Sequence, residues 1–167
     1  MEHRITEIAA KGAEKIKAVK SDLKGFEGIF KTLTEEHGLA HTLLRRVSTT
    51  VDPQVRADIW PKLRTALMAH EEGEMTILYR ALRQRAETRA LAEDHDALVQ
   101  DLDTLIERID GCAYQDPEWQ TFAATLLQLL EHHIQQEEST FFPRAQAALG
   151  NERAEELNEL YCRQKPS

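Results

Sequence analysis

Two stretches of the sequence repeat one pattern of polar residues inside an apolar helical stripe. LMAHEEGEMTILY (Leu67 to Tyr79) aligns with LEHHIQQEESTFF (Leu130 to Phe142), and both contain His-x-x-x-Glu. Four residues are slightly more than one helical turn, so the histidine and the glutamate project from the same helix face. That face is the apolar one, because the surrounding apolar residues follow spacings of three and four. A fold for this chain must therefore bury two imidazoles and two carboxylates.

The repeat extends to the segment that precedes each motif. LTEEH, which ends at His37, matches LAEDH, which ends at His95. Each half of the chain thus has a histidine on one helix and His-x-x-x-Glu on the next. Four helices are predicted to bring one histidine each to a shared interior, and two of them also bring a carboxylate. The candidate metal ligands are His37, His70, Glu74, His95, His133 and Glu137.

Helix signals divide the chain into long amphipathic segments with short connections. The apolar spacing predicts four long helices, over about 23–47, 53–84, 88–110 and 117–149. The Asp-Pro pairs at 52–53 and 116–117 predict N-caps followed by proline at the first helical position, and Pro61 marks either a bend or a later start of the second helix. This pattern is typical of an all-α, up-down-up-down four-helix bundle. We expect a short N-terminal helical extension at 1–22, the bundle at 23–149 and a short C-terminal tail helix at 150–167.

Composition restricts the setting in which the chain works. The 167 residues suffice for one domain, and a net charge of −8 disfavours nucleic-acid and anionic-membrane partners. The sequence contains neither a signal-peptide pattern nor the run of about 18 apolar residues that a spanning helix needs. Cys112 and Cys162 lie far apart without a C-x-x-C spacing, so neither a thiolate metal site nor a disulfide framework is indicated. We therefore expect a cytoplasmic protein.

Two buried carboxylates need a compensating positive charge, since each would otherwise cost several kcal/mol. The inward stripe offers no lysine or arginine, which disfavours a salt-bridge network, although a redox-inert helical module with a structural metal or none stays as the alternative. Haem between two histidines would leave the glutamates unexplained, and structural zinc takes four ligands and favours cysteine. The ferritin-like motif requires a glutamate three residues before the histidine, where this chain has Leu67 and Leu130. Four imidazoles and two carboxylates suit two octahedral ions, most naturally iron.

The complete set, His, His-x-x-x-Glu, His, His-x-x-x-Glu, resembles the hemerythrin family and its bacterial hemerythrin-like (HHE cation-binding) relatives over about 23–149. The resemblance implies a non-haem centre of two iron ions joined by an oxo or hydroxo bridge. In that arrangement one ion is bound by His37 and His70, the other by His95 and His133, and the carboxylates of Glu74 and Glu137 bridge them. It also implies a small ligand, namely dioxygen, nitric oxide or peroxide, in oxygen binding or sensing, protection against nitrosative or oxidative stress, or iron handling. Whether the chain is an enzyme stays open.

Two differences from the oxygen-carrying members disfavour a pure carrier. Those members have a further histidine one turn after the third-helix ligand, where this chain has Val99, and their last ligand is an aspartate five residues after its histidine. His41 lies one turn after His37, and three interpretations stay open: a fifth histidine ligand, a residue that supports a ligand, or a core residue.

The remaining polar and aromatic residues near the motifs are expected to have lesser roles. We place the glutamates beside the motifs on a solvated face, with Glu138 as the substitute if Glu137 is misassigned. Two histidines are expected to be solvated or at the rim, and three aromatic residues are expected to pack around the site and limit access of water. These residues are Glu71, Glu72 and Glu138; His3 and His132; and Tyr79, Phe141 and Phe142.

Overall fold

The computed structural model describes residues 25–165, which are helical apart from short connections. The long helices are α2 (Gly28–Thr49), α3 (Pro53–Gly73), α5 (Arg89–Asp110) and α6 (Pro117–Gln136). Two π-helical segments continue α3 and α6, namely η1 (Glu74–Tyr79), followed by α4 (Arg80–Arg83), and η2 (Glu137–Phe141), followed by α7 (Phe142–Leu149). The last helix is α8 (Asn151–Gln164). The predicted all-α class is confirmed, while the extension expected at 1–22 lies outside the described residues.

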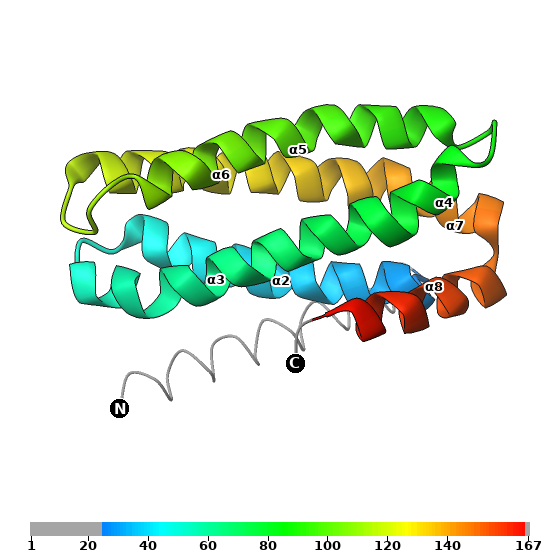
Figure 1. The fold of residues 1–167 in the computed structure, drawn as a ribbon, viewed down its shortest axis with the longest axis horizontal. Coiled ribbons are helices and arrows are strands. Elements are labelled where there is room, and N and C mark those ends of the chain that lie inside the picture. Colours follow the sequence, from blue (N-terminus) through cyan, green and yellow to red (C-terminus); the bar gives the residue numbers. More distant parts are fainter. Residues whose placement is uncertain (1–24, 166–167) are drawn as a thin grey trace.

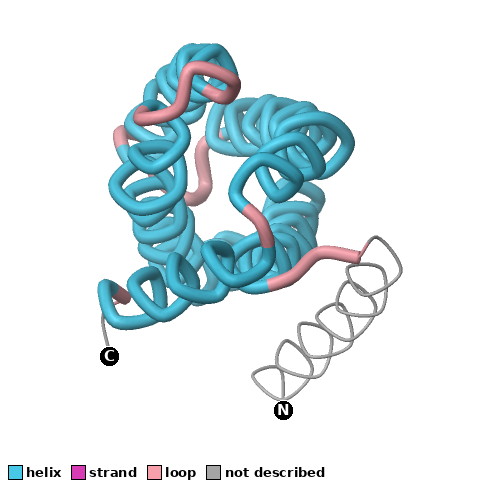
Figure 2. The backbone as a smooth tube through the Cα atoms, turned by 90° about the vertical axis from the view of Figure 1, so that its right-hand side faces the viewer, coloured by secondary structure: helices cyan, strands magenta, loops and turns pink. Residues whose placement is uncertain are grey.

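The long helices form a bundle. In Figure 1 they lie side by side, and the chain turns back at each connection between them. α2 packs against α3 and α6, and α5 packs against α4 and α6. Figure 2, viewed along the bundle, shows these helices arranged around a common axis, with α8 outside them. α8 packs against α2, η1 and α7, so the C-terminal helix lies on the outside of the bundle, next to the first π segment.

Local signals explain most of the helix boundaries. The N–H of Gln54 donates to Asp52 Oδ1 at 2.9 Å, and Pro53 opens α3, as predicted. α3 then continues through Pro61, which decides against a later start. The second predicted cap is wrong: the Asp116 side chain makes no cap bond to α6 and instead accepts from the N–H of Ala113 at 3.0 Å. That carboxylate stabilises the preceding turn, and proline alone marks the helix start.

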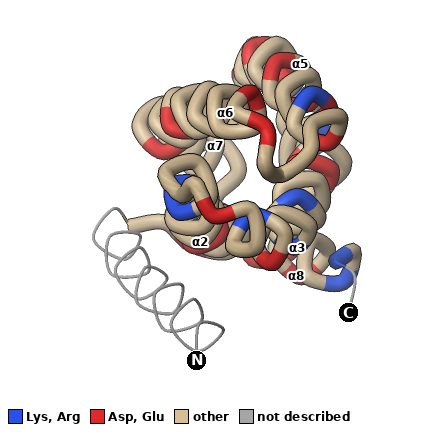
Figure 3. Tube along the Cα trace, turned by 90° about the vertical axis from the view of Figure 1, so that its left-hand side faces the viewer, with Lys and Arg blue, Asp and Glu red and all other residues tan. Residues whose placement is uncertain are grey.

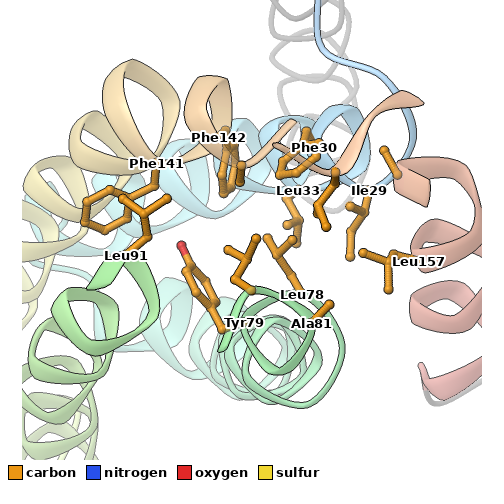
Figure 4. Close-up of a cluster of buried hydrophobic side chains, with 14 of the residues drawn as sticks. Ile29, Phe30, Leu33, Leu78, Tyr79, Ala81, Leu91, Phe141, Phe142 and Leu157 are labelled. Carbon is orange, nitrogen blue, oxygen red and sulfur yellow. The ribbon is translucent and has the colours of Figure 1, made fainter. Parts of the chain in front are cut away.

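Two apolar clusters fill the interior. α2 and α5 contribute to both, while α3 and α6 reach the first cluster through the segments that continue them. The first cluster contains Phe30, Leu78, Tyr79 and Phe142 and reaches α8 through Leu157; Figure 4 shows these residues pointing toward one another. The second lies toward the opposite end and is centred on leucine side chains of all four long helices, with Trp60 and Trp119 in edge-to-face contact. The buried histidines fall between the two clusters in the sequence of each helix, so the apolar ends isolate a polar layer.

Charge on the outside is mixed. Acidic residues outnumber basic ones by 29 to 21, and Figure 3 shows both kinds spread over several helices in that view. None of the helices among residues 25–165 combines the length and the apolar character that crossing a bilayer requires.

Candidate metal centre

The six candidate ligands meet in the polar layer. His37 comes from α2, His70 from α3, His95 from α5 and His133 from α6, while a glutamate opens each π segment. All six side chains are buried, with at most 7% of any residue exposed. The structure thus brings together every residue that the repeat singled out.

The carboxylates lie between the imidazoles. Glu74 Oε1 lies 3.4 Å from His70 Nε2, and its Oε2 lies 3.4 Å from His95 Nε2. Glu137 Oε2 lies 3.1 Å from His37 Nε2 and 3.3 Å from His133 Nε2. Each carboxylate therefore spans from the pair on α2 and α3 to the pair on α5 and α6, which is the position that a bridging ligand needs.

The ligand atoms form two groups, and within each group all atoms lie within 4.8 Å of one another. Glu74 belongs to both. The division separates His37 and His70 from His95 and His133, which is the pairing that the resemblance implied. The first group consists of His37, His70, Glu74 and Glu137, and the second of Glu71, Glu74, His95 and His133.

The atoms that face this interior lack hydrogen-bond partners within the part of the chain that the structure describes. They include Nε2 of all four histidines, both oxygens of Glu74 and Oε2 of Glu137. They approach one another within 4.0 Å as ion pairs, but not with hydrogen-bond geometry. Buried polar atoms in that condition cost free energy, and imidazole nitrogen and carboxylate oxygen are donors that divalent transition metals accept. The residues present fit a metal centre.

Charges within the cluster compensate one another. Burial raises the pKa of Glu74, and the Glu137 charge raises it further, yet His70 and His95 outweigh both and hold that pKa at about 2. Burial lowers the pKa of His133, but Glu137 outweighs it and raises the pKa to about 9. Without metal, the imidazoles of His70 and His133 thus hold protons whose charge offsets that of the buried carboxylates. A cation that binds there takes over the role of those protons.

Glu71 is not on the solvated face where we expected it. Only 6% of the residue is exposed, and its carboxylate oxygens lie 3.5 Å from His133 Nε2 and 3.8 Å from His95 Nε2. Burial raises the pKa of this carboxyl, and the charge of His133 opposes the rise. Glu71 is thus a seventh candidate ligand. The repeat contained a signal for it, because the aligned residue in the second half is the apolar Ile134.

Glu138 is also buried, contrary to the prediction of a solvated face. Its Oε1 accepts from Nδ1 of His37 at 3.0 Å, so it supports a candidate ligand while Glu137 occupies the interior. Glu72 and His132 are exposed as expected, whereas His3 lies outside the described residues. His41 belongs to neither group of ligand atoms, because its Nε2 pairs with Glu131 Oε1 at 2.8 Å in a partly exposed position.

The aromatic residues pack around the site as predicted, and one of them has a polar role that the sequence did not reveal. The Tyr79 ring stacks on His95 with ring centroids 3.7 Å apart, and its hydroxyl donates to Glu137 Oε1 at 2.5 Å. Phe142 stacks on His37 with centroids 5.7 Å apart. Phe141 is buried in the first apolar cluster. Burial and the neighbouring carboxylates raise the pKa of Tyr79, so the phenol keeps its proton and remains a donor.

Both His-x-x-x-Glu motifs change helix type at the glutamate. η1 begins at Glu74 and η2 begins at Glu137. A π turn is wider than an α turn, is rare, and is frequent at functional sites. Its occurrence at the same residue of both repeats indicates that the backbone distortion belongs to the construction of the centre.

Comparison with known proteins agrees with this geometry. The family model for the hemerythrin HHE cation binding domain matches residues 12–145. The chain belongs to this family. A protein described as a DNA nickase, from Nostoc sp. (strain PCC 7120 / SAG 25.82 / UTEX 2576), is 25% identical over 124 residues, which are 72% of this chain and 34% of that protein. The chain therefore spans about a third of that curated relative's length. No solved structure matches.

Family and geometry together indicate a metal-binding hemerythrin-like protein. The HHE domain is a cation-binding domain, and this hemerythrin-like chain has two adjoining groups of buried histidines and glutamates that could hold metal. The assignment of individual residues as ligands stays a prediction.

Proposed function

We propose that this chain is a hemerythrin-like protein with a non-haem di-iron centre that binds dioxygen, nitric oxide or peroxide. The observation that carries the proposal is the convergence of buried, unpartnered imidazole and carboxylate atoms into two groups that share Glu74. We place this centre in an up-down-up-down four-helix bundle at 23–149, between the N-terminal extension at 1–22 and the tail at 150–167. The ligands proposed are the six residues predicted from the repeat, with Glu71 added on the side of His95 and His133.

A cavity gives a small ligand access to one side of the centre. It has a volume of about 430 Å³, lies between α2 and α3, and has His37 and His70 in its wall among leucine and alanine side chains. That volume is ample for a diatomic molecule or a peroxide. Near Glu71 the interior is filled by Leu67, Leu102 and Leu126, which leave a cavity of about 10 Å³. We therefore expect ligands to arrive at the position held by His37 and His70.

The side chains around the centre have separable tasks. Iron in this site would supply open coordination positions for the small ligand. Phe142 covers His37, and Tyr79 covers His95 while its hydroxyl holds one oxygen of Glu137. These aromatic rings exclude water from the interior side of the centre, which strengthens electrostatic interactions there. The charge of −8 leads us to expect neither a nucleic-acid nor a membrane partner.

Iron loading tests the proposal directly. Purified protein is loaded with Fe(II) in the presence of air, freed of excess metal, and measured for iron content and absorption. We expect about two irons per chain with oxo-bridge bands. A colourless protein that binds clearly fewer than about two irons would instead be the redox-inert helical module.

A second measurement separates the biological roles within the proposal. The reduced, iron-loaded protein is mixed with dioxygen, nitric oxide or hydrogen peroxide, and the absorption change is followed for each. Reversible binding of dioxygen favours oxygen binding or sensing, while consumption of peroxide or stable binding of nitric oxide favours stress protection. Release of iron to a competing acceptor without any spectral response to the three ligands favours iron handling.

A further inference from the structure

The two sides of the centre differ in the hydrogen-bond partners of their histidine Nδ1 atoms. His70 Nδ1 donates to Glu36 Oε2 at 2.9 Å, and His37 Nδ1 donates to Glu138 Oε1 at 3.0 Å. The Nδ1 atoms of His95 and His133, by contrast, have no hydrogen-bond partner among residues 25–165. Both sides offer two imidazoles and two carboxylates to a metal, so the difference between them lies in the residues that support the imidazoles.

Glu36 is itself held by the C-terminal helix. The Tyr161 hydroxyl donates to Glu36 Oε2 at 2.6 Å, and Lys165 Nζ forms an ion pair with Glu36 Oε1. α8 lies outside the ring of long helices in Figures 1 and 2, yet Tyr161 is fully buried and its hydroxyl lies 3.5 Å from His70 Nδ1. An element outside the bundle therefore reaches the support of a candidate ligand inside it.

The approach of α8 depends on one glycine. A Cβ atom at Gly73 would lie 2.3 Å from Cε2 of Tyr161, so only glycine leaves room for the ring at this point of α3. Gly73 directly precedes Glu74, the carboxylate shared by both groups of ligand atoms. The close contact thus holds Tyr161 at the level of the metal ligands along the bundle axis, where its hydroxyl donates to Glu36.

A carboxylate behind a histidine has defined effects on metal binding. It fixes the proton on Nδ1, leaves Nε2 free to face the metal, holds the ring in one orientation and makes the imidazole a stronger donor. We propose that Glu36, held by Tyr161 and Lys165, is a positioning residue for His70, and that it makes the metal position at His37 and His70 the tighter of the two. The inference rests on the metal centre of the proposed function and adds to it a statement of which metal position binds more tightly.

Cobalt titration of the metal-free protein measures the two affinities. Co(II) is added to wild type, Glu36→Gln and Tyr161→Phe, and binding is followed by calorimetry and by the Co(II) absorption bands. Wild type should bind two ions with distinct affinities. Glu36→Gln should weaken the tighter position by about 10- to 100-fold and leave the weaker one unchanged. Tyr161→Phe should weaken the same position by less, because the ring still packs against Gly73 and only the donor to Glu36 is lost.

A third variant assigns the affected position. His133→Ala removes a donor from the second group only, so the tight binding should persist in it and should be weakened when Glu36→Gln is added. Glu159→Gln and Tyr114→Phe are matched controls, since Glu159 is exposed on α8 and Tyr114 lies in the connection before α6. Both controls should bind Co(II) like wild type.

The outcomes separate this inference from the proposed function. A wild type that binds no Co(II) contradicts the metal centre itself. A wild type with two indistinguishable positions, or with a tight position that neither Glu36→Gln nor Tyr161→Phe weakens, contradicts only the positioning role. Equal weakening of both positions, together with a fall in the unfolding free energy of the metal-free protein, shows that the residues stabilise the fold alone. Tyr161→Phe decides the question if Glu36→Gln fails to fold.

Discussion

At the scale of single residues, Glu137 has the most contacts within the centre. Its two oxygens lie within 3.4 Å of His37, His95 and His133, and one of them accepts from Tyr79. We expect Glu137→Ala to lose at least one of about two irons and to lower the melting temperature of the iron-loaded protein, because bound metal stabilises the native state by about 2.7 kcal/mol at a concentration 100-fold above Kd. Metal analysis and calorimetry measure both. Glu72→Ala is the exposed control, and unchanged iron content in Glu137→Ala would show that this carboxylate is not a ligand.

Tyr79 allows the hydrogen bond to be separated from the packing. Tyr79→Phe keeps the ring stacked on His95 and removes the donor to Glu137 Oε1. A buried hydrogen bond to a charged group contributes about 1.5–3 kcal/mol. We therefore expect the unfolding free energy of the metal-free variant, measured by urea unfolding, to be lower than that of wild type by an amount of that size. Iron content should be retained, while the absorption bands shift because one oxygen of Glu137 is released. Tyr114→Phe is the control, and an unchanged unfolding free energy would contradict the role of the hydroxyl.

At the scale of helical elements, Gly73 controls how closely α8 packs against α3. The Cβ of Gly73→Ala would lie 2.3 Å from Cε2 and 2.8 Å from Cδ2 of Tyr161. Overpacking costs about 1–3 kcal/mol and the better helix propensity of alanine returns about 1 kcal/mol, so we expect a net loss of up to about 2 kcal/mol in urea unfolding. Gly111→Ala has room for the new atom and a compatible backbone, and it should be neutral or slightly stabilising. Equal unfolding free energies of Gly73→Ala and Gly111→Ala would show that Tyr161 does not need the space at Gly73.

Some features of the helical elements are predictable from the sequence, and others are not. Periodicity and the repeat located the long helices and the six buried polar residues, because both patterns report directly which face of a helix is inside. The π segments were not predictable, since a single wide turn leaves no periodic signal. Glu71 and Glu138 were misplaced for a related reason: each follows an inward residue by one position, which on a uniform helix points away from the stripe, yet the polar layer is wide enough to bury both. The link from Tyr161 to Glu36 joins residues that are 125 positions apart, and no local pattern contains it.

At the scale of the whole molecule, the polar layer divides the interior into two apolar clusters. Each cluster has large buried side chains of its own, and in the metal-free state the histidines compensate the carboxylates between them. We therefore expect the metal-free protein to stay folded, with helical circular dichroism like that of the loaded form, but to melt at lower temperature. A stabilisation of about 2.7 kcal/mol corresponds to about 5–11 °C for a chain of this size.

Thermal unfolding before and after treatment with a chelator measures this difference. Readdition of Fe(II) should restore the melting temperature of wild type, which distinguishes loss of metal from irreversible damage. Glu137→Ala, if its centre is impaired, should melt at a temperature that responds little to the chelator. If the metal-free wild type were unfolded, the metal would be required for folding, which contradicts the prediction that the metal-free protein stays folded. An unchanged melting temperature would contradict the prediction that metal stabilises it. Because α2 and α5 each contribute to both apolar clusters and to the polar layer, a single cooperative transition is expected in both states.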